Sequence, residues 1–184
     1  MTLLRSLSTL GLCAFSLAVA DVTPSASQVF DRQLKSAEGE FVSLVEAMPA
    51  EKFGFAPTAG NFQGVRTFAL QAKHAAFVIY EISSALLGEA NPSSTGANEN
   101  GPEKLENKDE IVRYVKDAFA YGHKAMATLT NDNLMQQTAD PFDPKGKRTR
   151  VDSAGIILWH TFDHYGQMVE YARMNGIVPP ASRR

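Results

Sequence analysis

The chain has 184 residues, with 18 basic and 20 acidic side chains and a net charge of −2 at pH 7. This mildly acidic balance argues against nucleic acid as a partner, because phosphate backbones select basic surfaces. A chain of this length forms one domain with a substantial hydrophobic core, and its single cysteine excludes an internal disulfide.

The first twenty residues have the pattern of a secretory signal peptide. Arg5 is their only charge, an apolar run follows from Leu10 to Val19, and an A-x-A sequence ends at Ala20. A basic start, an apolar stretch of ~7–15 residues and small residues before the cleavage site are typical of a signal peptide, whereas a membrane span needs ~20 apolar residues. Cleavage after Ala20 predicts an exported protein, periplasmic or secreted, with residues 21–184 as its single mature domain.

Cleavage would also remove the only cysteine, Cys13. A lipoprotein site at Cys13 is the alternative, but Leu12 is bulkier than the small residue that such a site prefers. The mature chain then has 17 basic and 20 acidic side chains, and a metal site must use His, Asp and Glu. No further apolar run is long enough to span a bilayer, so we do not expect an integral membrane protein.

Apolar residues recur at three- and four-residue steps over about residues 27–48, which predicts a helix with one buried face. Ser25 or Ser27 can cap its start, and Pro49 ends it. Residues 50–66 combine phenylalanines with prolines and glycines. We expect this connector to be ordered and to pack across the end of a helical bundle.

The second helix is expected over about residues 67–87, with Gly88 as the residue that ends it. His74 belongs to its apolar stripe, and Glu81 lies two turns further along the same face. Residues 89–107 are rich in Asn, Ser, Gly, Pro and Glu. This composition predicts a surface loop with no chemical role.

The third helix is expected over about residues 109–129, with Asn107 as its cap and His123 at the margin of its core stripe. Residues 130–150 form another long connector with turn-forming Asp, Pro and Gly. A basic cluster near its end is expected to be solvated, and binding of an anionic substrate is the alternative. The cluster consists of Lys145, Lys147, Arg148 and Arg150.

The fourth helix is expected to run from a cap at Asp152 or Ser153 to Met174. Its inner face is apolar at both ends and polar in the middle, where His160 and His164 lie one turn apart. A polar patch inside a helix stripe is costly unless its groups are paired or bind a metal. Two imidazoles with this spacing can reach one ion, although such a pair also arises by chance.

The sequence contains no convincing alternating strand pattern, no internal repeat, no glycine-rich phosphate loop and no Ser/His/Asp motif. Four helices of about 20 residues with two long connectors predict an all-α four-helix bundle. Because the connectors are long, a simple up-down-up-down order is not required.

Three segments of the chain resemble the DinB-like superfamily of metal-binding four-helix bundles. Phe55-Ala56-Pro57 is similar to an aromatic-x-Pro element, and the segment from Thr67 to Ala75 is similar to a second helix that carries one histidine. The stretch His160-x-x-x-His164-Tyr165-Gly166-Gln167 resembles a closing H-x-x-x-H-R-G-Q element. Tyr165 departs from the pattern, because arginine is commoner there, so a role of that arginine in orienting helices or substrate does not carry over to this chain.

The resemblance implies an up-down-down-up helix order and places the family's three metal-binding histidines at His74, His160 and His164. Three neutral imidazoles leave at least one coordination position open, as in catalytic rather than structural sites. Zinc, nickel and ferrous iron all accept such ligands. The alternative is that these residues are ordinary core or surface histidines.

Two functions are open at this point. In the first, a bound ion lowers the pKa of a water or a thiol, and the protein is a metal-dependent transferase or hydrolase for a small molecule. Relatives in the resembled family include thiol-dependent transferases and isomerases. In the second, the bundle binds a metal without catalysis. The substrate, the metal and the oligomeric state, with a homodimer among the options, are left open.

Four other polar residues have expected or open roles. Asp163 is expected to form surface or interhelical hydrogen bonds rather than to bind metal. Glu81 is a candidate acceptor for an imidazole N–H, which metal-bound histidines usually require. Gln167 is a candidate for holding a water or a substrate, and His123 is expected to lie outside the site.

Overall fold

The computed structural model describes residues 23–93 and 97–183, so the predicted signal peptide lies outside the described residues. Four helices dominate: α1 (Ala26–Ala47), α2 (Phe68–Leu87), α3 (Lys108–Met126) and α4 (Arg150–Met174). The connectors contain the short strands β1 (Ala97–Asn98), β2 (Gly101–Pro102), β3 (Gln137–Asp140) and β4 (Asp143–Thr149). Single 3₁₀ turns lie at Ala50–Lys52 and Pro180–Ser182.

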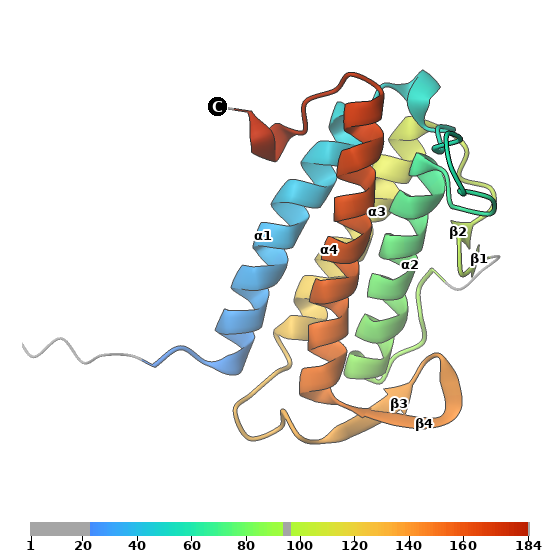
Figure 1. The fold of residues 1–184 in the computed structure, drawn as a ribbon. Helices are drawn as coiled ribbons and strands as arrows, with labels where there is room; N and C mark the ends of the chain where they lie inside the picture. Colours follow the sequence, from blue (N-terminus) through green and yellow to red (C-terminus); the bar gives the residue numbers. More distant parts are fainter. Residues whose placement is uncertain (1–22, 94–96, 184) are drawn as a thin grey trace, which may run out of the picture.

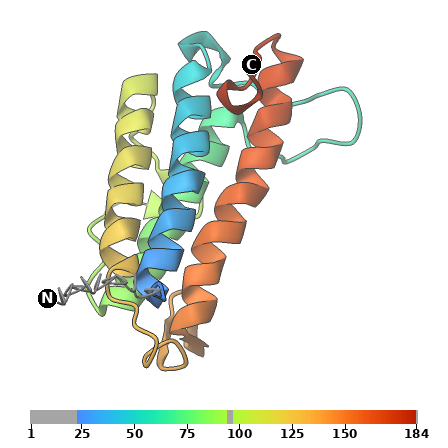
Figure 2. The same cartoon turned by 90° about the vertical axis from the view of Figure 1, so that its left-hand side faces the viewer.

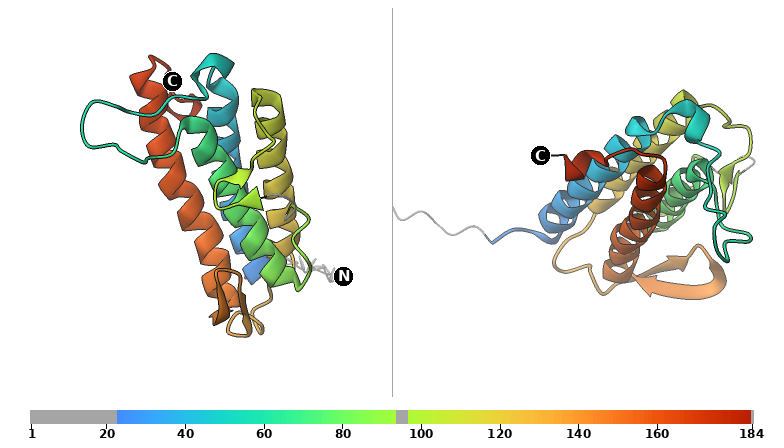
Figure 3. Two further views of the ribbon diagram at one scale, coloured as in Figure 1. Left: turned by 90° about the vertical axis from the view of Figure 1, so that its right-hand side faces the viewer. Right: turned by 45° about the horizontal axis from the view of Figure 1, so that its top comes forward.

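The four helices form an up-down-down-up bundle, in which α1 and α4 run in one direction and α2 and α3 in the other (Figure 1). Helix α1 packs between α3 and α4, as Figure 2 shows, and α2 packs between the same two helices on the opposite side (Figure 3). The expected bundle and helix order are therefore confirmed. No helix of the described residues is long and apolar enough to cross a membrane.

The core is apolar and tightly packed. Phe41 of α1 contacts Phe119 of α3 with ring centroids 5.9 Å apart, and both side chains are buried. Gly122 lets the helices approach closely, because a Cβ atom there would lie 3.1 Å from Leu34 and 3.2 Å from Ile79. Interiors at this density tolerate little change in volume.

Each helix begins at a side chain that accepts a hydrogen bond from the first turn. Ser25 forms a capping box at α1, and Thr67 and Asn107 cap α2 and α3. The expected start of α4 was wrong by about one turn. The cap is Thr149, whose hydroxyl accepts a hydrogen bond from the backbone N–H of Asp152.

The connector between α1 and α2 is ordered and packs across the bundle end, as expected. The Phe53 ring lies 5.5 Å from that of Phe68, and the Phe55 ring 5.7 Å from that of Tyr171. The Tyr171 hydroxyl also donates a hydrogen bond to the Arg66 carbonyl. The tip of this connector, which includes Phe62, remains exposed.

The other two connectors differ from the expectation, because each contains a two-stranded antiparallel hairpin. Strand β3 pairs with β4 from Gln137 opposite Thr149, with an irregularity between Ala139 and Asp140. Strand β4 is rich in charged residues and lacks an alternating apolar pattern, so its pairing depends on backbone hydrogen bonds that the sequence does not reveal.

The basic cluster of the third connector is not simply solvated. Arg148 pairs with Asp140 at 2.8 Å and with Asp152 at 3.4 Å. Arg150 donates hydrogen bonds to the Leu86 carbonyl and the Thr128 hydroxyl, and so ties the ends of α2 and α3 to the start of α4. Two of its four cations therefore have structural partners.

Candidate metal centre

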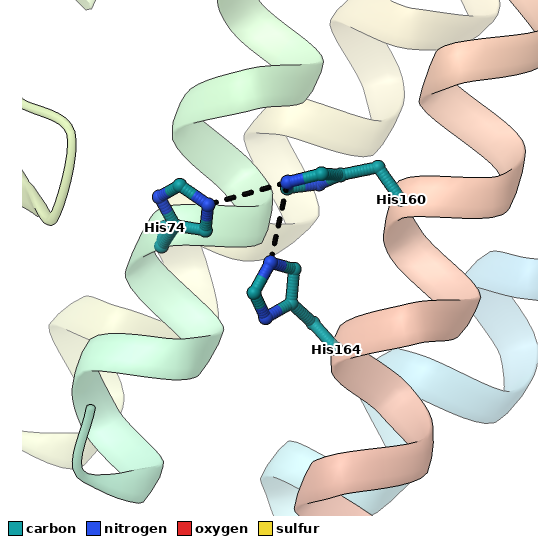
Figure 4. A group of neighbouring side chains, drawn as sticks. All are labelled: His74, His160 and His164. Carbon is teal, nitrogen blue, oxygen red and sulfur yellow. Dashed lines mark hydrogen bonds between the residues drawn. The ribbon is translucent and has the colours of Figure 1, made fainter. Parts of the chain in front are cut away.

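The structure brings the three predicted histidines together on the facing sides of α2 and α4 (Figure 4). Nε2 of His160 lies 3.2 Å from Nε2 of His74 and 3.2 Å from Nε2 of His164. His164 is buried, whereas His74 and His160 are partly exposed. The i,i+4 spacing on α4 and the packing of α2 against α4 together produce this cluster.

The outer hydrogen bonds fix the protonation of two rings. Nδ1 of His74 donates to the backbone carbonyl of Glu99, and Nδ1 of His164 donates to Oε1 of Gln71. Both acceptors offer only lone pairs, so in the neutral rings the proton lies on Nδ1 and Nε2 presents a lone pair. Two lone pairs therefore point at His160, which can donate one proton at most from its Nε2.

The arrangement fits a tetrahedral transition-metal ion. Bonds of about 2.0–2.1 Å from zinc to imidazole nitrogen imply nitrogen–nitrogen separations of roughly 3.3–3.4 Å in a tetrahedron. The separations of 3.2 Å from His160 to His74 and to His164 agree with that value, and all three ligand nitrogens lie within 4.8 Å of one another. Zinc, nickel and ferrous iron all accept three imidazole nitrogens as ligands.

Burial keeps these rings in the neutral form that binds a metal. It lowers the pKa of His164 to about 3 and that of His160 to about 4, with further lowering from neighbouring positive imidazoles. The pKa of His74 is also lowered, mainly by burial. Protons therefore compete weakly with a metal at neutral pH.

A chain of hydrogen bonds supports His164 from behind. Gln71 accepts from His164 and donates through Nε2 to Oε1 of Gln167 at 2.9 Å. Gln167 donates in turn to Asp163 at 3.2 Å, so Asp163 forms the hydrogen bond expected of it. Glu81, the expected candidate for such a role, instead accepts a hydrogen bond from Asn91.

Gln71 was missed in the sequence, although a signal was present. It lies three residues before His74, one turn away on the same side of a mainly apolar helix, and it is buried. A buried amide in that position needs a polar partner. The acceptor for His74 has no such signal, because it is a backbone carbonyl of a loop.

The α2–α3 connector reaches His74 because it is anchored to α2. The buried amine of Lys73 donates hydrogen bonds to the carbonyls of Pro102 and Leu105. Gly101 has a φ of +76°, and a Cβ atom there would lie 2.9 Å from Cβ of Lys73. Only glycine allows this approach, which places the carbonyl of Glu99 at the His74 ring. The sequence assigns no chemistry to this loop, and the structure adds a hydrogen bond between the loop and one of the clustered histidines.

His123 lies outside the cluster, as expected. Its ring bridges α3 to α1, with Nδ1 2.5 Å from Asp31 and Nε2 3.2 Å from Glu38. Tyr165 also lies away from the histidines, near Glu40, and burial raises its pKa. His123 is not part of the group of three histidines that could hold a metal ion.

A pocket of about 420 Å³ adjoins the cluster, and His74 and His160 form part of its lining. The other lining residues come from α2, α4 and the two hairpins: Phe77, Val78, Glu99, Phe142, Arg148, Ile156 and Trp159. Within residues 23–93 and 97–183, no fourth His, Cys, Asp or Glu side chain joins the three histidines. The site is thus a three-nitrogen cluster beside a pocket.

Comparison with known proteins agrees with this architecture. A crystal structure of a DinB-like protein from Bacillus cereus ATCC 10987 matches with a TM-score of 0.65 and 15% identity, and the match covers 82% of this chain and 93% of that chain. No curated protein matches the sequence. The family model described as DinB superfamily matches residues 33–168, a range that includes all three histidines. The chain therefore belongs to the DinB superfamily.

Proposed function

We propose that the protein is an exported metal-dependent enzyme in which His74, His160 and His164 hold a divalent zinc, nickel or iron ion. The observation that carries this proposal is the convergence of three imidazole nitrogens beside an accessible pocket, with no fourth protein ligand among the described residues. A structural ion is usually enclosed by four protein ligands, whereas a catalytic ion keeps a position for water or substrate. The non-catalytic alternative is therefore less well supported.

An ion bound at this site would supply Lewis acidity and would lower the pKa of a water or thiol. The chain's own residues prepare the site for such chemistry. Gln71 and the Glu99 carbonyl hold protons on the outer ring nitrogens and so keep the inner nitrogens free to bind. His74 and His160 line the pocket, so a substrate there would lie next to them. Transfer of a thiol and hydrolysis of an ester or amide both suit this arrangement.

Activity is tested with thiol-transfer, esterase and amidase substrates, assayed on purified protein before and after chelation. We expect one of these activities to disappear with chelation and to return when one of the three metals is added back. His164→Ala should lack it under all conditions, whereas His123→Ala should retain it. Activity that survives both chelation and His164→Ala would contradict the proposal.

Export is proposed from the signal-peptide pattern of residues 1–20. Expression of the full chain in a bacterial host, followed by cell fractionation and intact-mass measurement, tests it. The expected product begins at Asp21 and lies outside the cytoplasm. A cytoplasmic product that retains residues 1–20 would contradict export without affecting the metal proposal.

A further inference from the structure

The pocket beside the histidines is formed by four separate segments. Helices α2 and α4 contribute one wall each, the turn between β1 and β2 contributes Glu99, and the β3–β4 hairpin contributes Phe142 and Arg148. Its volume of about 420 Å³ lies at the lower end of the roughly 300–1,000 Å³ that ligand pockets span. A pocket of this size suits a molecule with one or two rings.

The walls of the pocket are mainly apolar. Trp159 of α4 and Phe142 of the β3–β4 hairpin are 60% and 50% exposed, and Phe77 and Ile156 line the same space. A single exposed apolar side chain is ordinary. Two large aromatic side chains that reach one pocket from different elements form an apolar surface for a ligand.

The charged groups at the pocket are already paired. Arg148 lies 2.8 Å from Asp140 and 3.4 Å from Asp152, and Glu99 lies 3.7 Å from Arg66. These five side chains comprise two cations and three carboxylates. The five together have a net charge of −1, and Arg148, the one Lys or Arg among the lining residues, already faces two carboxylates, so the pocket lining attracts an anionic ligand only weakly.

We propose that this pocket takes an uncharged small molecule whose aromatic ring or branched alkyl group packs against Phe142 and Trp159. The polar end of the molecule then faces His74 and His160. This substrate class deepens the proposed function and rests on it for the chemistry. Binding of the apolar end depends on the pocket walls alone.

The fluorescence of Trp159, the single tryptophan of the chain, reports binding directly. Benzamide and benzoate are suitable probes, because they have similar size and shape and differ in charge. Both are titrated into the purified mature protein before and after chelation. The chelated protein lacks a metal ion that could bind the carboxylate of benzoate directly. We expect benzamide to give a saturable blue shift and benzoate to need about ten-fold higher concentration in the chelated protein.

Three variants make the test specific. Phe142→Ala should weaken benzamide binding by about ten-fold, because it removes one apolar wall. Phe62→Ala is the matched control, since Phe62 is 41% exposed but lies in the α1–α2 connector outside this pocket. Asp152→Asn removes one carboxylate partner of Arg148. In the chelated protein it should therefore narrow the difference between the concentrations of benzoate and benzamide that are needed for binding.

Equal or tighter binding of benzoate in the chelated protein would overturn the proposal. Equal effects of Phe142→Ala and Phe62→Ala on benzamide binding would also overturn it. The same holds if Asp152→Asn leaves the difference between the benzoate and benzamide concentrations unchanged, or if benzamide gives no saturable fluorescence shift. The metal proposal can fail independently of the pocket proposal. If benzamide binds as expected but loss of the histidines leaves metal content unchanged, the pocket assignment stands and the proposed metal enzyme does not.

Discussion

Replacement of Gln71 by leucine tests whether the residues behind the histidines prepare the site. Gln71 is buried and accepts the Nδ1 proton of His164, so leucine leaves that N–H without its acceptor. An unsatisfied buried donor costs about 1–3 kcal/mol, and loss of such an outer hydrogen bond typically lowers metal affinity by about 10- to 100-fold. The free energy of unfolding of the metal-free protein should fall by at most the same 1–3 kcal/mol, since leucine adds apolar burial.

Zinc affinity is measured by competition with a chromophoric chelator, and stability by urea unfolding in the presence of a chelator. Gln71→Glu provides a rescue variant, because a carboxylate still accepts the His164 proton. Ser83→Ala is the matched control, since Ser83 is a buried polar residue of α2 whose hydroxyl has no hydrogen-bond partner among the described residues. Zinc affinity of Gln71→Leu within two-fold of the wild type would refute this reasoning.

Three further predictions concern pH, the α2–α3 connector and the fourth histidine. The pKa values of His160 and His164 are lowered to about 4 and about 3, so below pH 6.5 the unfolded chain binds more protons than the folded one. Stability of the metal-free protein should therefore fall as the pH drops from about 6.5 towards 3–4, and urea unfolding should show a smaller fall in His160→Ala/His164→Ala. Gly101→Ala forces a side chain into a positive-φ position against Lys73, and should cost about 1–3 kcal/mol in urea unfolding and weaken zinc binding. His123→Ala should lower stability through its lost α1–α3 contacts, yet leave zinc affinity at the wild-type value in the same competition assay.

Local sequence pattern was enough to predict the four helices and to place two of the three clustered histidines on one helix face. The spacing of His160 and His164 places both on one helix face whatever the rest of the chain does. The partnership with His74 depends on how α2 docks against α4, which periodicity does not specify, and the family resemblance supplied it. For Arg150 the local pattern was misleading. A charge-rich stretch predicts a solvated side chain, whereas the Arg150 guanidinium donates hydrogen bonds at the ends of α2 and α3.

The remaining features of the site depend on contacts that no local pattern encodes. The acceptor for His74 is the carbonyl of Glu99, and it is positioned by the close approach of Gly101 to Lys73. Phe142 reaches the pocket only because β3 and β4 pair through their backbones. Backbone groups and tertiary approach of this kind leave little trace in residue type.

The central claim is that His74, His160 and His164 hold a metal ion, and metal content tests it most directly. Purified mature protein, His160→Ala/His164→Ala and the control His123→Ala are analysed by inductively coupled plasma mass spectrometry after identical expression. We predict about one zinc, nickel or iron ion per chain in the wild type and the control, and a near-complete loss in the double variant. Equal metal content in all three proteins would contradict the claim.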